Sequence, residues 1–214
     1  MAAKEHAITI IGCGPGSPDY VTPAARAAAQ QADCLLGADR LLKLFPESSA
    51  EKLSIGSSMQ EILDSIALRV ERQKVGVLVS GDPGLYSLSK LVLERFGRSM
   101  CQIIPGISSV QVAFAAIGLD WEGARIVSAH KENPSLDPSW AQEEKIAVLG
   151  GRTESVQWLA EQLLPLLPEP VIFLCENLTL EDESIREVRS DELTNEAMST
   201  RVVMLIVNRR LLLE

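Results

Sequence analysis

Short apolar segments alternate along the chain with segments whose apolar residues recur every three to four positions. Residues 7–12 (AITIIG) and 75–79 (VGVLV) are continuously apolar and rich in β-branched side chains, which is typical of strands buried on both faces. Residues 59–70 instead place apolar side chains at helical spacing, so a helix there would bury one face. This alternation predicts an α/β protein.

The first half of the chain repeats a unit of strand, loop and helix. Thr22 and Pro23 have the residue types of a helix N-cap and first helical position, so a helix is expected from there to about residue 32. The other elements expected in this half are strands at 33–36 and 100–104 and helices at 85–96 and 107–117. A strand that is followed by a helix before the next strand predicts a mainly parallel sheet.

After residues 118–123 the predicted strands follow one another more closely. They are expected at 125–129, 146–149, 171–175, 185–189 and 202–207, and the clearest helix is expected at 154–164. The last strands lack crossover helices, so this sheet should be mixed. We therefore expect two α/β domains, at residues 1–118 and 123–214.

Composition and charge narrow the function classes. The 214 residues include 20 Lys and Arg against 29 Asp and Glu, a net charge of −9 that argues against nucleic-acid binding. The apolar run at 202–207 is far shorter than the roughly 20 residues that span a membrane, and no signal peptide is visible at the start. These features predict a cytoplasmic protein with no membrane partner.

Metal binding is not indicated by the cysteine and histidine pattern. The four cysteines form no C-x-x-C pair, and the two histidines are His6 and His130. A structural zinc site usually draws on closely spaced pairs of such ligands. We expect no metal site and four reduced, buried cysteines.

A glycine-rich loop follows the first predicted strand. Residues 12–17 read G-C-G-P-G-S, and a Rossmann fingerprint, G-x-G-x-x-G opening directly into a helix, is the obvious comparison. Here the third glycine comes one residue early, Pro15 removes a backbone donor and Pro18 delays the helix. A tight turn or a close backbone approach to a ligand both remain open for this loop.

Two more loops of this kind follow later strands. Residues 80–87 read S-G-D-P-G-L-Y-S, where Asp82 could accept hydrogen bonds from a ligand or cap a helix that begins near Pro83. Residues 104–109 read I-P-G-I-S-S, whose hydroxyls could likewise cap a helix or contact a ligand. All three loops should lie at equivalent ends of neighbouring parallel strands, where open α/β sheets bind ligands.

Nucleophilic catalysis finds little support. The chain has no G-x-S-x-G elbow and no Walker G-x-x-x-x-G-K-[ST] pattern. His130 and Lys131 end a predicted strand, where they could meet carboxylates or simply lie in solvent. No catalytic base is identified from the sequence.

Taken together, the three loops resemble those of the tetrapyrrole (corrin/porphyrin) methylase family. The matching segments are I-I-G-C-G-P-G at 10–16, S-G-D-P-G-L-Y-S at 80–87 and I-P-G-I-S-S at 104–109. Within the family, A-D-R-L-L at 38–42, V-S-A-H at 127–130 and C-E-N-L-T-L at 175–180 resemble the branch that methylates C5 of a precorrin or cobalt-precorrin ring in cobalamin biosynthesis. Lys131 stands where that branch usually has glycine.

The resemblance implies a fold, a cofactor and sites. It implies two α/β domains with an active-site cleft between them, usually as a homodimer, and S-adenosyl-L-methionine as methyl donor. Carried over to this chain, the cofactor-binding residues are Gly81, Asp82, Gly84, Leu85, Tyr86, Ser108 and Ser109. The loop with Gly12, Gly14, Pro15 and Gly16 would lie beside the tetrapyrrole. The chain resembles only the N-terminal part of enzymes that also methylate C15 with decarboxylation, a step that a separate subunit would perform.

The implied chemistry needs no catalytic triad. The sulfonium carries an activated methyl group and an electron-rich ring carbon is the nucleophile, so the protein chiefly aligns the two, a contribution of about 7–11 kcal/mol. Because the ring carries many carboxylates, we expect a local basic rim formed by Arg40, His130, Lys131 and Arg152.

Other functions remain open at this point. The same family could act on another corrin position, on diphthine or on ribosomal RNA, although the acidic balance counts against RNA. A non-catalytic nucleotide-binding α/β module is an alternative from a different class. An NAD-dependent oxidoreductase is weaker, because the first glycine loop is out of register with the fingerprint.

Overall fold

The structure is a computed structural model that describes residues 7–56, 58–193 and 198–213. The chain divides into two compact units, Met1–Ser108 and Ser109–Glu214, each of which has its own five-stranded sheet. The first sheet is parallel and the second is mixed, which confirms the expected α/β class.

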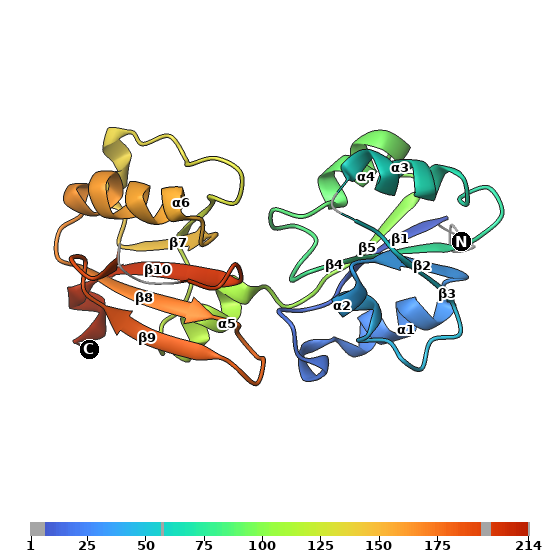
Figure 1. Cartoon of the computed structure of the whole chain (residues 1–214), viewed down its shortest axis with the longest axis horizontal. Coiled ribbons are helices and arrows are strands. Elements are labelled where there is room, and N and C mark those ends of the chain that lie inside the picture. Colours follow the sequence, from blue (N-terminus) through green and yellow to red (C-terminus); the bar gives the residue numbers. More distant parts are fainter. Residues whose placement is uncertain (1–6, 57, 194–197, 214) are drawn as a thin grey trace. The chain divides into compact units, whose positions relative to one another are not determined.

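The sheet of the first unit has the strand order β3-β2-β4-β1-β5 and is parallel throughout (Figure 1). Its strands are β1 (Ile8–Gly12), β2 (Cys34–Gly37), β3 (Glu51–Ser54), β4 (Val75–Val79) and β5 (Cys101–Ile104). β1 lies between β4 and β5, and the carboxyl ends of all three strands meet at one edge. The expected adjacency of the three glycine loops is thereby confirmed.

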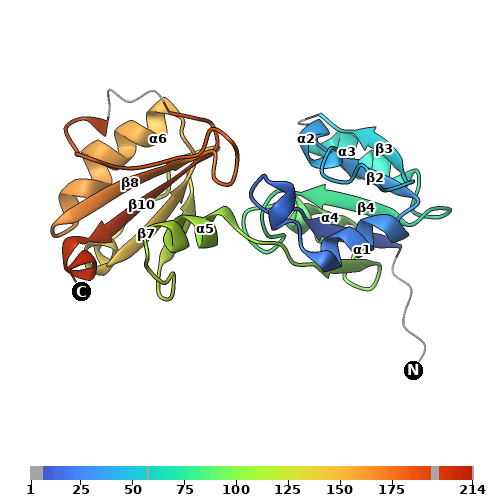
Figure 2. The ribbon, with the colours of Figure 1, turned by 90° about the horizontal axis from the view of Figure 1, so that it is seen from below.

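Helices cover both faces of this sheet (Figures 1 and 2). They are α1 (Pro23–Gln31), α2 (Asp39–Leu42), α3 (Met59–Ala67) and α4 (Ser89–Phe96), with a 3-10 turn η1 (Pro18–Tyr20) before α1. Ile8 and Ile10 of β1 belong to the apolar cluster under α3 and α4, whereas Ile11 belongs to the cluster under α1 and α2. Burial on both faces explains why β1, β2 and β4 read as continuous apolar runs.

Local signals set the helix boundaries. Thr22 Oγ1 accepts a hydrogen bond from the Ala25 amide (3.1 Å), so the predicted N-cap of α1 is confirmed. α4, by contrast, begins at Ser89 rather than at residue 85. Tyr86 has a φ of +45°, and the Ser87 hydroxyl donates to the Pro83 carbonyl (2.6 Å), so residues 83–88 form a turn instead of the first turns of the helix.

The sheet of the second unit has the order β6-β7-β10-β8-β9, with β6 and β7 parallel and the other neighbours antiparallel. The strands are β6 (Arg125–Ser128), β7 (Lys145–Leu149), β8 (Pro170–Glu176), β9 (Ser184–Val188) and β10 (Val202–Asn208). The expectation of a mixed sheet is confirmed. Because β10 runs antiparallel to both neighbours, its start lies at the same edge as the ends of β7 and β8.

Two helical elements cover opposite faces of this sheet (Figure 2). α5 (Ser109–Ala116) contacts β10, whereas α6 (Thr153–Trp158) packs over the other face. The helix expected at 154–164 is present as α6 followed by a π-helical turn η3 (Leu159–Leu163) and a 3-10 turn η4 (Leu164–Leu166). Two further 3-10 turns are η2 (Pro138–Gln142) and η6 (Arg209–Leu212).

Two absences predicted from the sequence can be checked against the described residues. Within residues 7–56, 58–193 and 198–213, no helix is long and apolar enough to cross a membrane. The four cysteines, all of which are described, are free and buried, as expected. His6 lies outside the described residues.

Candidate functional site

The loops after β1 and β4 are joined through their backbones. The Gly81 amide donates to the Gly14 carbonyl (2.8 Å) and the Gly14 amide donates to the Gly81 carbonyl (3.3 Å), so the two residues form an isolated antiparallel bridge. Both glycines have a positive φ, of +76° for Gly14 and +63° for Gly81, which L side chains rarely adopt. The two loops therefore form one continuous structure beyond the ends of their strands.

The loop after β5 touches the other two at glycine positions. A Cβ atom on Gly12 would lie 2.5 Å from the Gly106 nitrogen, and one on Gly106 would lie 2.3 Å from the Gly81 carbonyl oxygen. No real Cβ atom makes such contacts with backbone, so only glycine allows the three loops to approach this closely. The side-chain space of Gly12 is thus taken up by neighbouring protein.

Gly81 differs from these two glycines. Its Cβ position has no atom closer than 3.8 Å, which is ordinary van der Waals distance, and the nearest one belongs to the backbone of Ser108. A Cβ atom on Gly81 would therefore meet no close contact, and it is the positive φ that favours glycine at this position. Ser108 itself is buried, and Ser109 begins α5.

Asp82 connects the loop after β4 to the loop after β5. Its Oδ1 accepts a hydrogen bond from the Gly84 amide (2.7 Å), and its Oδ2 accepts one from the Gly106 amide (3.1 Å). The alternative role of Asp82 as the cap of a helix near Pro83 is ruled out, because α4 begins only at Ser89. Both oxygens of this half-buried carboxylate instead hold loop backbone.

Tyr86 projects from the same loop. Its φ of +45° is unusual for a bulky residue, and its side chain is 59% exposed. Ser87 and Ser89 both donate to the Pro83 carbonyl and so fix the turn on which Tyr86 lies. An exposed aromatic side chain on a fixed, strained turn is well placed for contact with a ligand.

Arg40, in α2, reaches the same edge of the sheet. Its guanidinium donates to the Ser80 hydroxyl, which links the end of β2 to the end of β4. Its positive charge also acts on the buried Cys13 thiol, although burial dominates there and raises the pKa of Cys13 to about 12. This thiol is therefore protonated at neutral pH and is no nucleophile.

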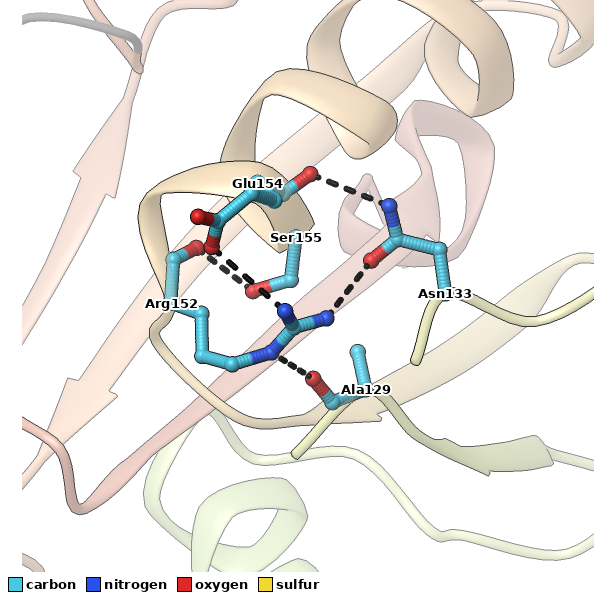
Figure 3. A network of polar contacts seen from close by, with 5 residues as sticks. All are labelled: Ala129, Asn133, Arg152, Glu154 and Ser155. Carbon is cyan, nitrogen blue, oxygen red and sulfur yellow. Dashed lines mark hydrogen bonds and ion pairs between the residues drawn. The ribbon is translucent and has the colours of Figure 1, made fainter. Parts of the chain in front are cut away.

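A second polar cluster lies at the carboxyl edge of β6 and β7 in the second unit (Figure 3). Arg152 Nε donates to the Ala129 carbonyl (2.9 Å), Nη2 donates to Asn133 Oδ1 (3.2 Å), and Nη1 lies 3.4 Å from Glu154 Oε2. Asn133 Nδ2 in turn donates to the Glu154 carbonyl (3.2 Å). Arg152 thus ties together the two loops that follow these strands.

His130 and Lys131 are exposed at this edge of the second unit. Partial desolvation, followed by the nearby positive charge of Arg152, lowers the pKa of His130. A Cβ atom on Gly150 would lie 3.1 Å from the His130 backbone nitrogen, so the ends of β6 and β7 also pack closely. At neutral pH the positive charge of this edge comes from Lys131 and Arg152.

A profile of the family described as Tetrapyrrole (Corrin/Porphyrin) Methylases matches residues 7–194, which is most of the chain. The chain belongs to the tetrapyrrole methylase family. All three glycine loops and the cluster around Arg152 lie within the matched residues.

Individual proteins also resemble the chain over most of its length. The cobalt-precorrin-7 C(5)-methyltransferase of Salmonella typhimurium is 32% identical over 179 residues, which is 83% of this chain and 88% of that protein. The precorrin-6Y methylase of Archaeoglobus fulgidus aligns with a TM-score of 0.73 at 25% identity, over 96% of this chain and 99% of that one. Uroporphyrin-III C-methyltransferase of Thermus thermophilus, complexed with S-adenosylhomocysteine, aligns with a TM-score of 0.77 at 22% identity, over 94% and 91% of the two chains.

The residues predicted for the site of this tetrapyrrole methylase fall into two groups. Those of the first unit are brought together by the three loops and Arg40, and Ser109 follows them directly in the chain. The residues in this group are Gly12, Gly14, Pro15, Gly16, Arg40, Gly81, Asp82, Gly84, Leu85, Tyr86, Ser108 and Ser109. His130, Lys131 and Arg152 share the edge of the second unit.

Sequence reasoning did not single out Gly106, Ser80 or Asn133, although each contacts a predicted residue. The Pro-Gly pair after β5 was the signal available for Gly106. For Ser80 and Asn133 no local signal exists, because their partners are 40 and 19 residues away. Among the described residues, no group of three or more His, Cys, Asp or Glu could hold a metal ion.

Proposed function

We propose that this tetrapyrrole methylase transfers a methyl group from S-adenosyl-L-methionine to C5 of a precorrin or cobalt-precorrin ring in cobalamin biosynthesis. The observation that carries the proposal is the junction of three glycine loops at the ends of β4, β1 and β5. Carboxyl ends of adjacent parallel strands are where sheets of this class bind their ligands.

The choice of ring position rests on relatives. The Salmonella typhimurium protein, named a cobalt-precorrin-7 C(5)-methyltransferase, matches over more than four fifths of both chains. The Archaeoglobus fulgidus structure is named a precorrin-6Y methylase and is matched almost end to end. Similarity over nearly the whole of both chains supports the same type of acceptor.

The loop residues fit the proposed cofactor. The backbone at Gly81 is uncrowded, the hydroxyl of the half-buried Ser109 can donate and accept hydrogen bonds, and Tyr86 offers an exposed ring. These groups suit a nucleoside that carries an amino-acid tail, and the Thermus thermophilus relative is complexed with S-adenosylhomocysteine. When bound, the sulfonium of S-adenosylmethionine supplies an activated methyl group.

The chain's own residues bind and orient the two reactants in this proposal. The residues proposed to line the cofactor site are Gly81, Asp82, Gly84, Leu85, Tyr86, Ser108 and Ser109. The first loop, Arg40, His130, Lys131 and Arg152 contact the tetrapyrrole, whose carboxylates suit guanidinium and ammonium donors. Alignment of donor and acceptor accounts for about 7–11 kcal/mol of the barrier in such reactions.

The first experiment is calorimetric titration with S-adenosylhomocysteine, with NAD as control. We expect micromolar binding of S-adenosylhomocysteine and no binding of NAD. Isotope-labelled methyl transfer is then followed with cobalt-precorrin-7, cobalt-precorrin-4 and uroporphyrin III as acceptors, and NMR locates the label on the ring. Label at C5 of cobalt-precorrin-7 supports the proposal.

Other outcomes would redirect the assignment. Label on cobalt-precorrin-4 or uroporphyrin III alone would keep the family chemistry and overturn the C5 position. Cofactor binding with no transfer to any acceptor would favour the non-catalytic module. Binding of NAD in place of S-adenosylhomocysteine would overturn the cofactor.

A further inference from the structure

We infer that Asp82 is a positioning residue, which shapes the cofactor site by fastening the loop after β4 to the loop after β5. This inference rests on the proposed function and changes the role of one residue within it. The carboxylate acts through Gly84 and Gly106, and not through a bond of its own to the cofactor.

The two hydrogen bonds of Asp82 differ in what they join: one is local and the other links two loops. The bond from the Gly84 amide to Oδ1 (2.7 Å) closes a local turn of the kind that aspartate commonly forms with the residue two positions on. The bond from the Gly106 amide to Oδ2 (3.1 Å) spans 24 residues of sequence and joins separate loops. Hydrogen bonds to a charged acceptor are stronger than those between neutral groups.

The surroundings explain why this second bond matters. Gly106 is the residue whose Cβ would meet the Gly81 carbonyl at 2.3 Å, so the loops already touch there through bare backbone. Glycine makes both loops conformationally free, and a directed bond is needed to choose one arrangement. The Gly81 backbone and Ser108, both proposed to contact the cofactor, lie on the two sides of this contact.

The first variant, Asp82→Asn, can keep only one of these two hydrogen bonds. Its amide keeps the size of the side chain but has one oxygen, so one of the two backbone N–H groups must face an NH₂ donor. Asp82→Ser is the second variant: its hydroxyl can keep a turn with Gly84, but its single oxygen cannot serve Gly106 as well. Asp137→Asn is the matched control, since Asp137 closes the same kind of turn with the Ser139 amide (2.8 Å), far from these loops in sequence.

The test measures amide exchange in the ligand-free protein and the Kd of S-adenosylhomocysteine in the same variants. We expect Asp82→Asn and Asp82→Ser to speed exchange at the amides of residues 106–108 without speeding it in the strands, and to raise the Kd about ten- to a hundred-fold. Asp137→Asn should change neither quantity at these loops.

Each alternative result overturns the inference in a different way. A raised Kd with unchanged exchange would give Asp82 a direct bond to the cofactor. Faster exchange with an unchanged Kd would mean that the bond between Asp82 and Gly106 holds the loops together but does not shape the cofactor site. Failure of the wild-type protein to bind S-adenosylhomocysteine would instead overturn the proposed function, and the positioning role with it, and that failure is visible before any variant is compared.

Discussion

At the scale of single residues, burial decides the chemistry of the cysteines. Cys13 and Cys175 lie fully inside the two units, and burial raises the pKa of each thiol to about 12. Burial raises the pKa of Cys34 and Cys101 as well. A thiol whose charged form is this unfavourable packs as a small apolar side chain.

These thiols predict how stability changes with pH. Because the folded pKa values lie above the unfolded ones, the unfolded chain loses thiol protons first, and the free energy of unfolding should fall as pH rises from about 9 towards 12. Each such thiol contributes a slope of about 1.4 kcal/mol per pH unit. Urea unfolding between pH 8 and 10.5 measures this slope, which Cys13→Ala should reduce.

The same property can be checked chemically at constant pH. At pH 8 a thiol-specific disulfide reagent should react with no cysteine of the native protein and with all four after unfolding. Rapid labelling of native Cys13 would contradict the assignment of a buried, protonated thiol.

Gly106 offers a second test at the residue scale. Gly106→Ala would put a Cβ atom 2.3 Å from the Gly81 carbonyl oxygen, and the loops must separate to relieve this contact. We expect a loss of about 1–3 kcal/mol in the free energy of unfolding, as for other overpacked sites, together with weaker binding of S-adenosylhomocysteine.

Gly56→Ala is the matched control for Gly106→Ala, because a Cβ atom on Gly56 would meet nothing within 4 Å. Its stability and cofactor affinity should stay close to those of the wild type. If Gly106→Ala behaved like Gly56→Ala in urea unfolding, the close packing of the three loops would be wrong.

At the scale of elements, the ends of β6 and β7 are held together by one side chain. Arg152 donates to the Ala129 carbonyl, to Asn133 and towards Glu154, and so most of its hydrogen-bonding capacity is spent within the protein. Its proposed contact with a carboxylate of the tetrapyrrole would use the exposed part of the guanidinium, since a third of the side chain remains exposed.

Arg152→Ala should therefore have two effects. The pKa of His130 should rise, because one of the two causes that lower it is removed, and NMR titration of the imidazole measures this change. The KM for the tetrapyrrole should increase about tenfold, with a smaller change in the cofactor Kd. Arg189→Ala, which breaks an exposed ion pair with Asp191, is the control. Equal changes in KM and Kd would refute the substrate role.

The elements also show how far the sequence could predict the fold. Strands buried on both faces, such as β1 and β4, have apolar runs that identify them without further information. β3 was missed because Glu51–Ser54 is a short, largely polar strand at the sheet edge, with no buried face to impose alternation. The late start of α4 depends on the conformation of Tyr86, which propensity does not encode.

The candidate site was predictable in the same uneven way. Glycine-rich loops at strand ends can be recognised from their composition. Because the strands before them are adjacent and parallel, the loops lie side by side. The bond from Gly106 to Asp82 and the bonds of Arg152 to Ala129 and Asn133 could not be predicted, because each joins residues at least 19 positions apart through atoms whose geometry only the folded backbone fixes.

At the scale of the whole molecule, the chain consists of two units of similar length with different sheets. The first unit, with its parallel sheet, carries the two loops proposed for the cofactor, together with the first glycine loop and Arg40, which are proposed for the tetrapyrrole. The second, a mixed sheet, carries the basic edge proposed for the tetrapyrrole. The boundary between the units falls between Ser108 and Ser109, at the end of the third glycine loop. The net charge of −9 is compatible with an anionic substrate because Arg40, Lys131 and Arg152 each lie three residues after the end of a strand, so positive charge is available at the strand ends.

The backbone contacts among Gly12, Gly81 and Gly106 have a consequence for engineering this molecule. Each of the three loops packs against the backbone of the other two. A loop taken from a related methylase therefore fits only if it follows the same backbone path. A graft of one loop would meet two unaltered neighbours at distances with no room for adjustment. Changes of cofactor or acceptor preference at this edge should therefore be sought by exchanging the three loops as a single cassette.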